Sequence, residues 1–304
     1  MSISNPEKLA KIKLPKGIAF IDHKDTLLLI MNRKGTSANM QTDAAAFEAW
    51  ALVAKAHGYN KVQLIEDESN EDFEINKSNP TYNRFLYRVL RFWEGFNDWF
   101  SPDEELLERA HVFEKKFLQN TDLFLSPPEY EASLSPSRPE AIIESRFGDP
   151  NNFAYLNRLI RADCSSFFRQ LPVGLYHEKI VSANAVFSSG SADLWGLEGP
   201  VFHLIELKTG NNKSIGVLSE LYFYACFIRD MFINNMAVKT NSDYRGYNEL
   251  LNADISSVNA HIVHQSGCMH PQLSPAFKEL QKCSLMGIKF CTVADYRIED
   301  LVSL

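Results

Sequence analysis

The sequence predicts an α/β fold, and three observations support this prediction. Apolar segments of strand length alternate with longer segments whose apolar residues recur at helical spacing. Apolar residues make up 45% of the 304 residues, which is enough for a large buried core. A Ser/Pro-rich stretch over residues 126–137 marks a boundary, so we expect an N-terminal α+β section of unknown role (1–130) and a second domain (131–304).

In the N-terminal section, turn residues and helix caps divide the chain into short elements. We expect, in order, a hairpin of strands 18–21 and 26–31, a helix over 42–57 that ends at Gly58, a strand over 61–65, an acidic solvated loop over 66–74, a helix over 81–100, and a helix opened by a capping box at 101–104.

In the second domain, helices are expected to precede a group of strands. The expected elements are a helix opened by the capping box Ser137–Glu140, a helix from about 149 to 172, strands over 174–181, 183–195 and 202–208, and a helix from about 214 to 232. Residues 197–200, Leu-Glu-Gly-Pro, are a plausible turn between the last two strands.

The strand over residues 202–208 carries a Glu-x-Lys triplet. Side chains alternate between the faces of a strand, so Glu206 and Lys208 point the same way. A carboxylate and an ammonium on a mostly buried strand are costly unless they are paired or bound to an ion. The triplet is therefore a candidate functional site.

Asp193 lies on the preceding strand and can face Glu206 across the turn. Two converging carboxylates repel each other, and a hard divalent cation such as Mg²⁺ or Mn²⁺ is the usual resolution. A lysine beside such a cation can orient water and stabilise charge on a phosphate. The arrangement is suited to phosphodiester hydrolysis.

Asp193, Glu206 and Lys208 resemble the core motif of the PD-(D/E)XK nuclease superfamily, and Ile205–Gly210 looks most like its RecB-like exonuclease branch. The resemblance covers about residues 135–265. It implies a restriction-endonuclease-like core, a mixed central sheet flanked by helices. It also implies that Asp193, Glu206 and the Leu207 carbonyl bind Mg²⁺ or Mn²⁺, that Lys208 is catalytic, and that DNA is the substrate, with RNA as an alternative. Ala192 stands where the family name has proline.

The RecB-like branch is also similar in a helical Gln-x-x-x-Tyr motif, where this chain has Glu220 and Tyr224. By this resemblance both residues belong to the catalytic set. The alternative is that Glu220 pairs with a nearby Lys or Arg and Tyr224 belongs to the core. The resemblance also implies a helix before the first core strand that often contributes a further acid. Glu144 is the better candidate for that further metal contact, because Glu140 caps its helix.

Several charged residues outside this motif are candidates for contact with nucleic acid. Arg84, Arg88 and Arg91 share a helical face, which suits backbone binding, but Glu94 and Asp98 extend that face and favour an intrahelical salt-bridge ladder. The other candidates, each weighed against ordinary surface charge, are Arg158, Arg161, Arg169, His177, Glu178 and Lys179.

The net charge of −7 argues against a nucleic-acid packaging protein but is compatible with a nuclease. The five cysteines are odd in number and widely spaced, as expected of reduced thiols, so neither an iron–sulfur cluster nor zinc at His261, His264, Cys268 and His270 is favoured. No signal peptide or spanning segment is visible, and we expect a cytoplasmic protein that does not bind membranes.

Three hypotheses remain open at this point. The first is the metal-dependent deoxyribonuclease. The second is a catalytically inactive relative that serves as a nucleic-acid-binding or protein-interaction scaffold, and the third is a hydrolase of smaller phosphodiesters. The sequence leaves the oligomeric state open, and a dimer is compatible with it.

Overall fold

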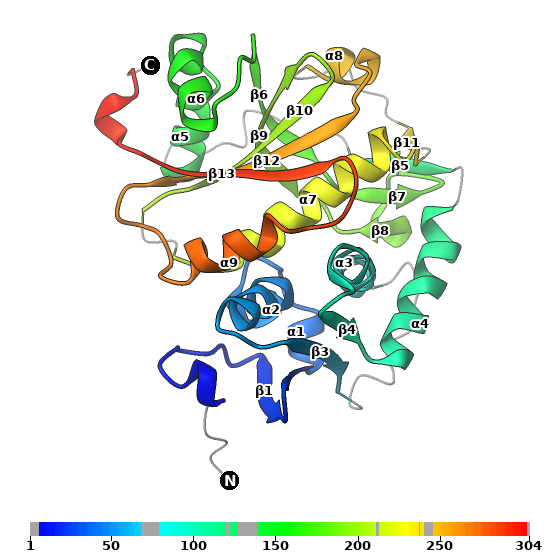
Figure 1. The fold of residues 1–304 in the computed structure, drawn as a ribbon. Coiled ribbons are helices and arrows are strands. Elements are labelled where there is room, and N and C mark those ends of the chain that lie inside the picture. Colours follow the sequence, from blue (N-terminus) through cyan, green and yellow to red (C-terminus); the bar gives the residue numbers. More distant parts are fainter. Residues whose placement is uncertain are drawn as a thin grey trace.

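The computed structural model describes residues 6–67, 79–119, 122–126, 139–210, 213–236, 238–239 and 246–302. In this part of the chain the protein is a mixed α/β fold with three mixed sheets. Figure 1 shows the layers in order from top to bottom: a helical layer, the largest sheet, two layers of helices, and an N-terminal sheet.

The largest sheet has the strand order β13-β12-β10-β9-β6. Its strands are β6 (Phe167–Pro172), β9 (Ser191–Glu198), β10 (Val201–Lys208), β12 (Ser257–Gln265) and β13 (Ile288–Tyr296). Strands β6, β9 and β10 are antiparallel neighbours, whereas β10, β12 and β13 run parallel. The parallel pairs require crossovers, and α7 (Val217–Phe232) and α9 (Leu273–Leu280) provide them.

Both faces of this sheet are buried, because its strands present apolar side chains in alternation to two separate clusters. On β10, Phe202 and Leu204 join the cluster that includes α7, whereas Ile205 and Leu207 join the cluster beneath α5 (Pro139–Phe147) and α6 (Phe153–Ile160). Glu206 and Lys208 therefore lie on the α7 face of the sheet.

The N-terminal sheet has the order β1-β2-β3-β4, formed by β1 (Ile18–His23), β2 (Thr26–Met31), β3 (Lys61–Glu66) and β4 (Phe100–Pro102). Helices α2 (Phe47–Ala56) and α3 (Pro80–Phe96) lie between it and α7 (Figure 1). Both are almost completely buried, and aromatic rings from α2, α3 and α7 contact one another. The N-terminal section thus packs directly on the helix that covers the largest sheet.

A third, smaller sheet has the order β11-β5-β7-β8 and consists of β5 (Leu123–Leu125), β7 (Leu175–His177), β8 (Ala185–Phe187) and β11 (Val238–Lys239). It pairs a strand from before residue 130 with strands from the second half of the chain. The remaining helices are α1 (Arg33–Thr36), α4 (Glu104–Phe113), which continues as a π-turn over Glu114–Leu118, and α8 (Tyr247–Asn252).

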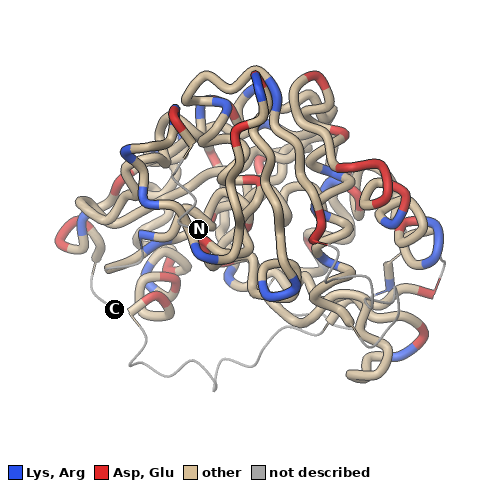
Figure 2. The backbone as a smooth tube through the Cα atoms, turned by 90° about the horizontal axis from the view of Figure 1, so that it is seen from below, with Lys and Arg blue, Asp and Glu red and all other residues tan. Residues whose placement is uncertain are grey.

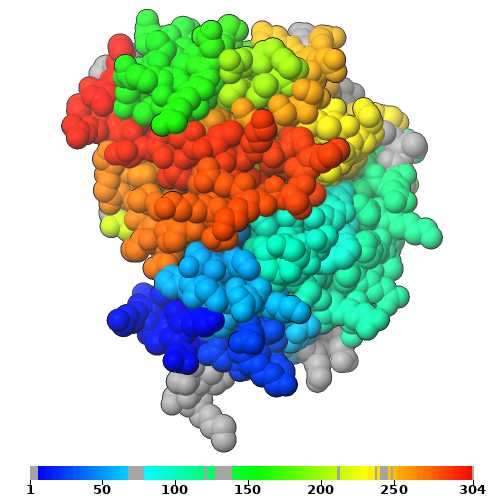
Figure 3. Space-filling model, viewed as in Figure 1, coloured from blue at the N-terminus to red at the C-terminus, as the bar shows by residue number. Residues whose placement is uncertain are grey.

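One hydrophobic cluster extends from Leu9 to Phe290 and contains residues of both halves of the chain. In Figure 3 the N-terminal segments in blue and cyan lie against the C-terminal segments in orange and red. The Ser/Pro-rich stretch that marks the expected boundary falls mostly on residues 127–138, outside the described residues.

Several expected elements are confirmed. The N-terminal hairpin pairs β1 with β2, and the turn at Gly199, whose φ of +55° suits glycine, joins β9 to β10. Helices α2, α3 and α7 and strand β3 occupy the segments where the sequence predicts them, within a few residues at each end.

Other expectations were wrong. Residues 167–172, expected at the end of a helix, form β6, because α6 ends at Ile160 with Arg161 in the left-handed conformation. The expected first core strand, 174–181, contributes only β7, which belongs to the small sheet. The cap of α4 is Asp103, which accepts from the amide of Leu106, rather than Ser101, which lies in β4.

The acidic stretch 66–74 is partly outside the described residues. Its first residue, Glu66, ends β3 and accepts a hydrogen bond from the Tyr82 hydroxyl, at 2.8 Å, so this residue is not in a solvated loop. Within the described residues, no helix is long and apolar enough to cross a membrane.

Candidate functional site

The β9–β10 hairpin brings Asp193 and Glu206 together. The antiparallel register pairs Ile205 with Leu194, so the next residues along each strand, Glu206 and Asp193, are opposite each other at the end of the ladder. Opposite residues of an antiparallel pair project to the same face. The expectation that these two carboxylates share a face is supported by this register.

Lys208 links two glutamates on this face. Its Nζ lies 2.7 Å from Glu206 Oε1 and 3.1 Å from Glu220 Oε2. Glu206 and Glu220 are each only 1% exposed. The Tyr224 hydroxyl, also buried, donates to Glu220 Oε1 at 3.1 Å. The structure therefore brings Glu206, Lys208, Glu220 and Tyr224 into one buried cluster, and the lysine that pairs with Glu220 is the one from the Glu-x-Lys triplet.

Asp193 is the partly exposed member of this cluster. Its Oδ2 accepts a hydrogen bond of 2.7 Å from the backbone amide of Leu207. Desolvation raises the pKa of Asp193 to about 7, and the nearby carboxylates of Glu144 and Glu220 act in the same direction, whereas Lys208 opposes the shift. Asp193 is therefore the acid of this cluster that solvent can reach, and its pKa is raised.

Glu206, Lys208 and Glu220 shift one another's pKa values. Burial, together with the carboxylates of Asp193 and Glu220, raises the pKa of Glu206 well above its usual range. Burial alone would raise the pKa of Glu220 too, but hydrogen bonds and the charge of Lys208 lower it. Burial opposes the charge on Lys208, yet the surrounding carboxylates raise the pKa of this lysine well above its usual range. Lys208 is therefore a permanently protonated donor at neutral pH.

A residue from the N-terminal section completes the cluster. The side-chain amide of Gln41 donates a short hydrogen bond to Glu220 Oε1. The loop that carries Gln41 is bound to the start of α7: Ser214 Oγ donates to the Gln41 carbonyl at 2.7 Å, and the Ile215 amide donates to Asp43 Oδ1 at 3.0 Å. A Cβ at Gly216 would lie only 2.4 Å from the Gln41 carbonyl oxygen, so this approach requires glycine.

Glu144 reaches the same region from α5. It is buried, and Gln170 Nε2 donates to its Oε2 at 3.2 Å. The β6–β9 ladder pairs Arg169 with Leu194 and Leu171 with Ala192, so Gln170 lies opposite Asp193. Gln170 has a φ of +54°, an unusual conformation for a residue other than glycine. Gln170 thus binds Glu144 from the strand that is paired with the one carrying Asp193.

The carboxylates of the cluster suit a divalent cation in part. Asp193, Glu206 and Glu220 bring three carboxylates against one ammonium, and Glu206 Oε2 is a buried oxygen without a hydrogen-bond donor. The raised pKa values of Glu206 and Asp193 mean that their charged forms are disfavoured, and a hard cation with oxygen ligands is a group that would stabilise those charged forms. Within the described residues, however, no group of three or more His, Cys, Asp or Glu side chains is arranged to hold a metal. The fit is therefore to Asp193, Glu206 and a backbone carbonyl such as that of Leu207.

Among the described residues, the intrahelical salt-bridge ladder expected along α3 is reduced to one pair, Arg91 with Glu94. Arg84, Arg88 and Arg91 share a face, but all three are buried and lie inside the molecule. Arg88 forms a two-point ion pair with Glu48 of α2, and Arg91 pairs with Asp230 of α7 at 2.7 Å and with Glu94 at 2.9 Å. Only the last pair is intrahelical. These arginines bind α3 to its neighbours.

The other basic candidates lie elsewhere. Arg158 and Arg161 are exposed, and Arg158 stacks over Tyr155 of its own helix. His177 contacts Glu178 at 3.3 Å beside the small sheet. His261, expected to be no zinc ligand, stacks against His203 with the ring centroids 5.3 Å apart, and burial lowers its pKa to about 3. All five cysteines are free thiols.

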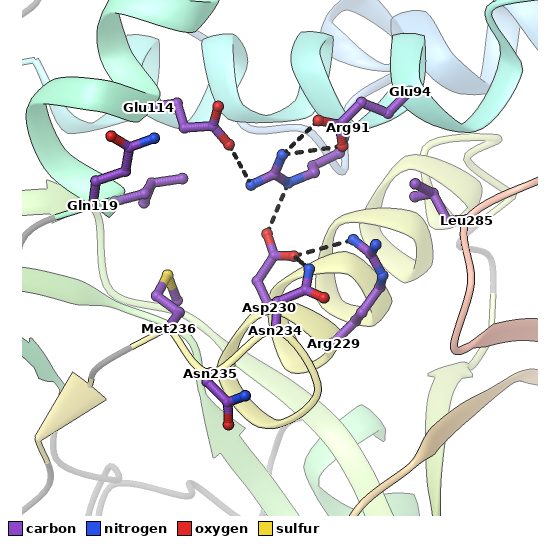
Figure 4. A pocket seen from close by; sticks show the side chains of 11 residues that line it. Arg91, Glu94, Glu114, Gln119, Arg229, Asp230, Asn234, Asn235, Met236 and Leu285 are labelled. Atoms are coloured by element: carbon purple, nitrogen blue, oxygen red, sulfur yellow. Dashed lines mark hydrogen bonds and ion pairs between the residues drawn. The ribbon is translucent and has the colours of Figure 1, made fainter.

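A larger hollow of about 540 Å³ lies where α3, α4 and α7 meet. Figure 4 shows that its charged side chains point toward one another. Arg91 and Arg229 both bind Asp230, at 2.7 and 3.2 Å, and Arg91 also binds Glu114 at 2.8 Å. The charges of this hollow are satisfied internally, unlike those of the Asp193–Glu206 cluster.

Sequence reasoning did not identify Gln41, Gln170 or the ion-pair partners of the arginines. Gln41 lies on a loop without a motif, and its role depends on contacts with α7. Comparison with known proteins finds no significant match to any family model, curated protein or solved structure.

Proposed function

We propose that the protein is a metal-dependent nuclease that hydrolyses phosphodiester bonds of DNA at a PD-(D/E)XK-like site. The observation that carries the proposal is the convergence of Asp193, Glu206 and Glu220 on Lys208, in a buried site where desolvation raises the pKa of Asp193 and Glu206. Perturbed carboxylates with a shared lysine are typical of functional sites.

The order of elements supports a restriction-endonuclease-like core. Helix α5 precedes three antiparallel strands, β6, β9 and β10, and α7 then leads to β12, which is parallel to β10. This is a mixed sheet flanked by helices, as the resemblance implies. The helix before the first strand supplies Glu144, the acid expected there.

In the proposed mechanism, Asp193, Glu206 and the Leu207 carbonyl would hold Mg²⁺ or Mn²⁺, and the bound cation would supply Lewis-acid activation of the phosphate. Glu206 and Glu220 hold the Lys208 ammonium in place. Because this lysine stays protonated, its role is to donate hydrogen bonds to the attacking water or the phosphate rather than to accept a proton. Water forms a new bond to phosphorus while the bond to one ester oxygen breaks.

One departure from the family pattern bears on the proposal. Glu220 replaces the glutamine of the Gln-x-x-x-Tyr motif, but Gln41 supplies an amide that contacts Glu220. Tyr224 keeps its place and holds Glu220 through its hydroxyl. Burial raises the pKa of Tyr224 well above its usual range, so this hydroxyl remains a donor. These two side chains orient Glu220, which in turn positions Lys208.

The alternative is a catalytically inactive relative that acts as a binding scaffold. The observation that favours it is the lack, among the described residues, of a group of three or more acidic, His or Cys ligands. Figure 2 shows Lys and Arg interspersed with Asp and Glu along the backbone, which is compatible with either function.

The deciding experiment is cleavage of linear and circular, single- and double-stranded DNA, and of RNA, by the full-length protein in Mg²⁺ or Mn²⁺. Asp193→Asn and Glu206→Gln keep the side-chain shapes, and Glu198→Gln is the matched control, a carboxylate near the other end of the same hairpin. The nuclease is supported if cleavage needs the cation and is lost in the first two variants only. Absence of cleavage, with no Mn²⁺ binding by calorimetry, supports the scaffold.

A further inference from the structure

A second, smaller pocket of about 160 Å³ opens beside the acidic cluster. Its lining is polar and basic. It includes Ser37, Asn39, Arg84, Arg88, Ser188 and Ser189. The pocket holds roughly five water volumes, which is room for one small anion with water but too little for a nucleoside.

Arg84 is the unusual member of this lining. Its side chain is more than nine-tenths buried, with 9% exposed, and its Nε is a buried donor without a hydrogen-bond partner. One terminal nitrogen donates to the Ser188 carbonyl, and the guanidinium lies 5.2 Å from the centre of the Phe223 ring. Within the described residues no carboxylate forms an ion pair with it. A buried, unpaired guanidinium is costly in the absence of an anion.

Arg88 provides the internal comparison. It lies one turn further along α3 and lines the same pocket, yet Glu48 binds both its Nε and a terminal nitrogen, and the Ala45 carbonyl accepts a further bond of 2.9 Å. Arg88 therefore has a direct carboxylate partner, whereas among the described acids Arg84 has only the longer-range attraction of Glu220. A bound anion would supply the direct partner that the Arg84 guanidinium lacks.

The pocket adjoins the candidate active site on two sides. Met40 lines it, and the next residue, Gln41, binds Glu220. Ser188 and Ser189 line it just before β9, the strand that carries Asp193. The charge on Arg84 also interacts with Tyr224 and Glu220.

We propose that this pocket binds a phosphate group of the substrate other than the one that is cleaved, with Arg84 as the principal contact. The proposal rests on the proposed nuclease function for the identity of the substrate, but the pocket itself is defined by its own residues. Guanidinium groups bind phosphate oxygens through charge-assisted hydrogen bonds, and the serine hydroxyls at the rim add neutral donors.

The first test uses inorganic phosphate and needs no catalysis. In EDTA, at constant ionic strength set with chloride, phosphate should raise the thermal midpoint of the wild-type protein. Ser189→Asp places a carboxylate at the rim on an exposed residue and should weaken phosphate binding about tenfold or more. The matched control is Ser182→Asp, an exposed serine outside the pocket, which should bind phosphate within about twofold of wild type. Arg84→Lys tests the guanidinium directly, with circular dichroism to verify its fold.

The second test measures cleavage of an oligonucleotide. Ser189→Asp should raise KM about tenfold while kcat changes little, because the pocket lies away from the reacting phosphate. The inference is overturned if phosphate does not stabilise the wild type, if both aspartate variants bind it equally, or if KM is unchanged in Ser189→Asp. If phosphate binds as expected but no nucleic acid is cleaved, the pocket stands as a phosphate site and the nuclease proposal fails.

Discussion

Gln41 donates its side-chain amide to Glu220, a residue 179 positions further along the chain. The bond joins a loop of the N-terminal section to the centre of the buried charge cluster. Ser214, Ile215 and Gly216 at the start of α7 hold that loop in place. The N-terminal section, for which the sequence offers no chemistry, is therefore part of the candidate site.

Replacement of Gln41 by alanine should destabilise the protein by about 1–3 kcal/mol, because Glu220 Oε1 loses a donor in a buried site. Urea unfolding measures this loss. The matched control is Gln281→Ala. Both glutamines are exposed, but Gln281 donates to the Cys291 carbonyl rather than to a buried carboxylate, so its effect should be smaller. Equal effects of the two substitutions would contradict the role assigned to Gln41.

Glu206→Gln should stabilise the metal-free protein by about 1 kcal/mol or more at pH 8, because the wild-type cluster buries an acid that must take up a proton. The same substitution should abolish metal-dependent cleavage. Glu198→Gln is the control and should show neither effect. A loss of stability in Glu206→Gln would mean that the ionised Glu206 stabilises the fold, and the argument for a functional site would lose its main support.

Lys208→Met should destabilise the protein by about 3–5 kcal/mol at neutral pH, since the ionised Glu220 loses its cation and Glu206 loses a hydrogen-bond donor. The deficit should shrink at acid pH, where Glu220 binds a proton, because the pKa of Glu220 is lowered in the folded protein. Lys213→Met, at an exposed lysine, is the control. A deficit that does not depend on pH would indicate lost packing rather than lost charge compensation.

The pKa of Asp193 predicts a pH dependence of stability in EDTA. The folded-state pKa is raised from 3.8 to about 7, so the folded protein binds the proton more tightly than the unfolded chain does. The contribution of this proton is fully present below the unfolded pKa and is lost as pH rises through about 7. Urea unfolding from pH 4 to 8 should therefore show a steeper fall for wild type than for Asp193→Asn. Parallel curves for the two proteins would rule out the shift.

Local patterns were sufficient for the hairpin and its charged residues. Alternation along residues 202–208 predicts that Glu206 and Lys208 share a face, and the Gly199 turn predicts that Asp193 returns opposite Glu206. Both inferences need only the two-residue period of a strand and a tight turn. The α/β class follows in the same way from periodicity.

Local patterns were insufficient where contacts with distant segments decide the conformation or the environment of a residue. Residues 167–172 have no strong strand signal, and pairing with β9 makes them β6. The spacing of Arg84, Arg88 and Arg91 correctly predicts a shared face, but it cannot predict whether that face meets solvent or protein. Their partners, including Glu48 and Asp230, come from distant helices.

The sequence alone therefore determined the α/β class, the β9–β10 hairpin and the shared face of Glu206 and Lys208, because each depends on neighbours in the chain. The tertiary structure decided which charges are compensated. Gln41 reaches Glu220, Glu48 neutralises Arg88, and Arg84 stays unpaired among the described residues, because packing of α2, α3 and α7 sets the distances between them. Burial then determines the energy of each charge, and no local pattern encodes it.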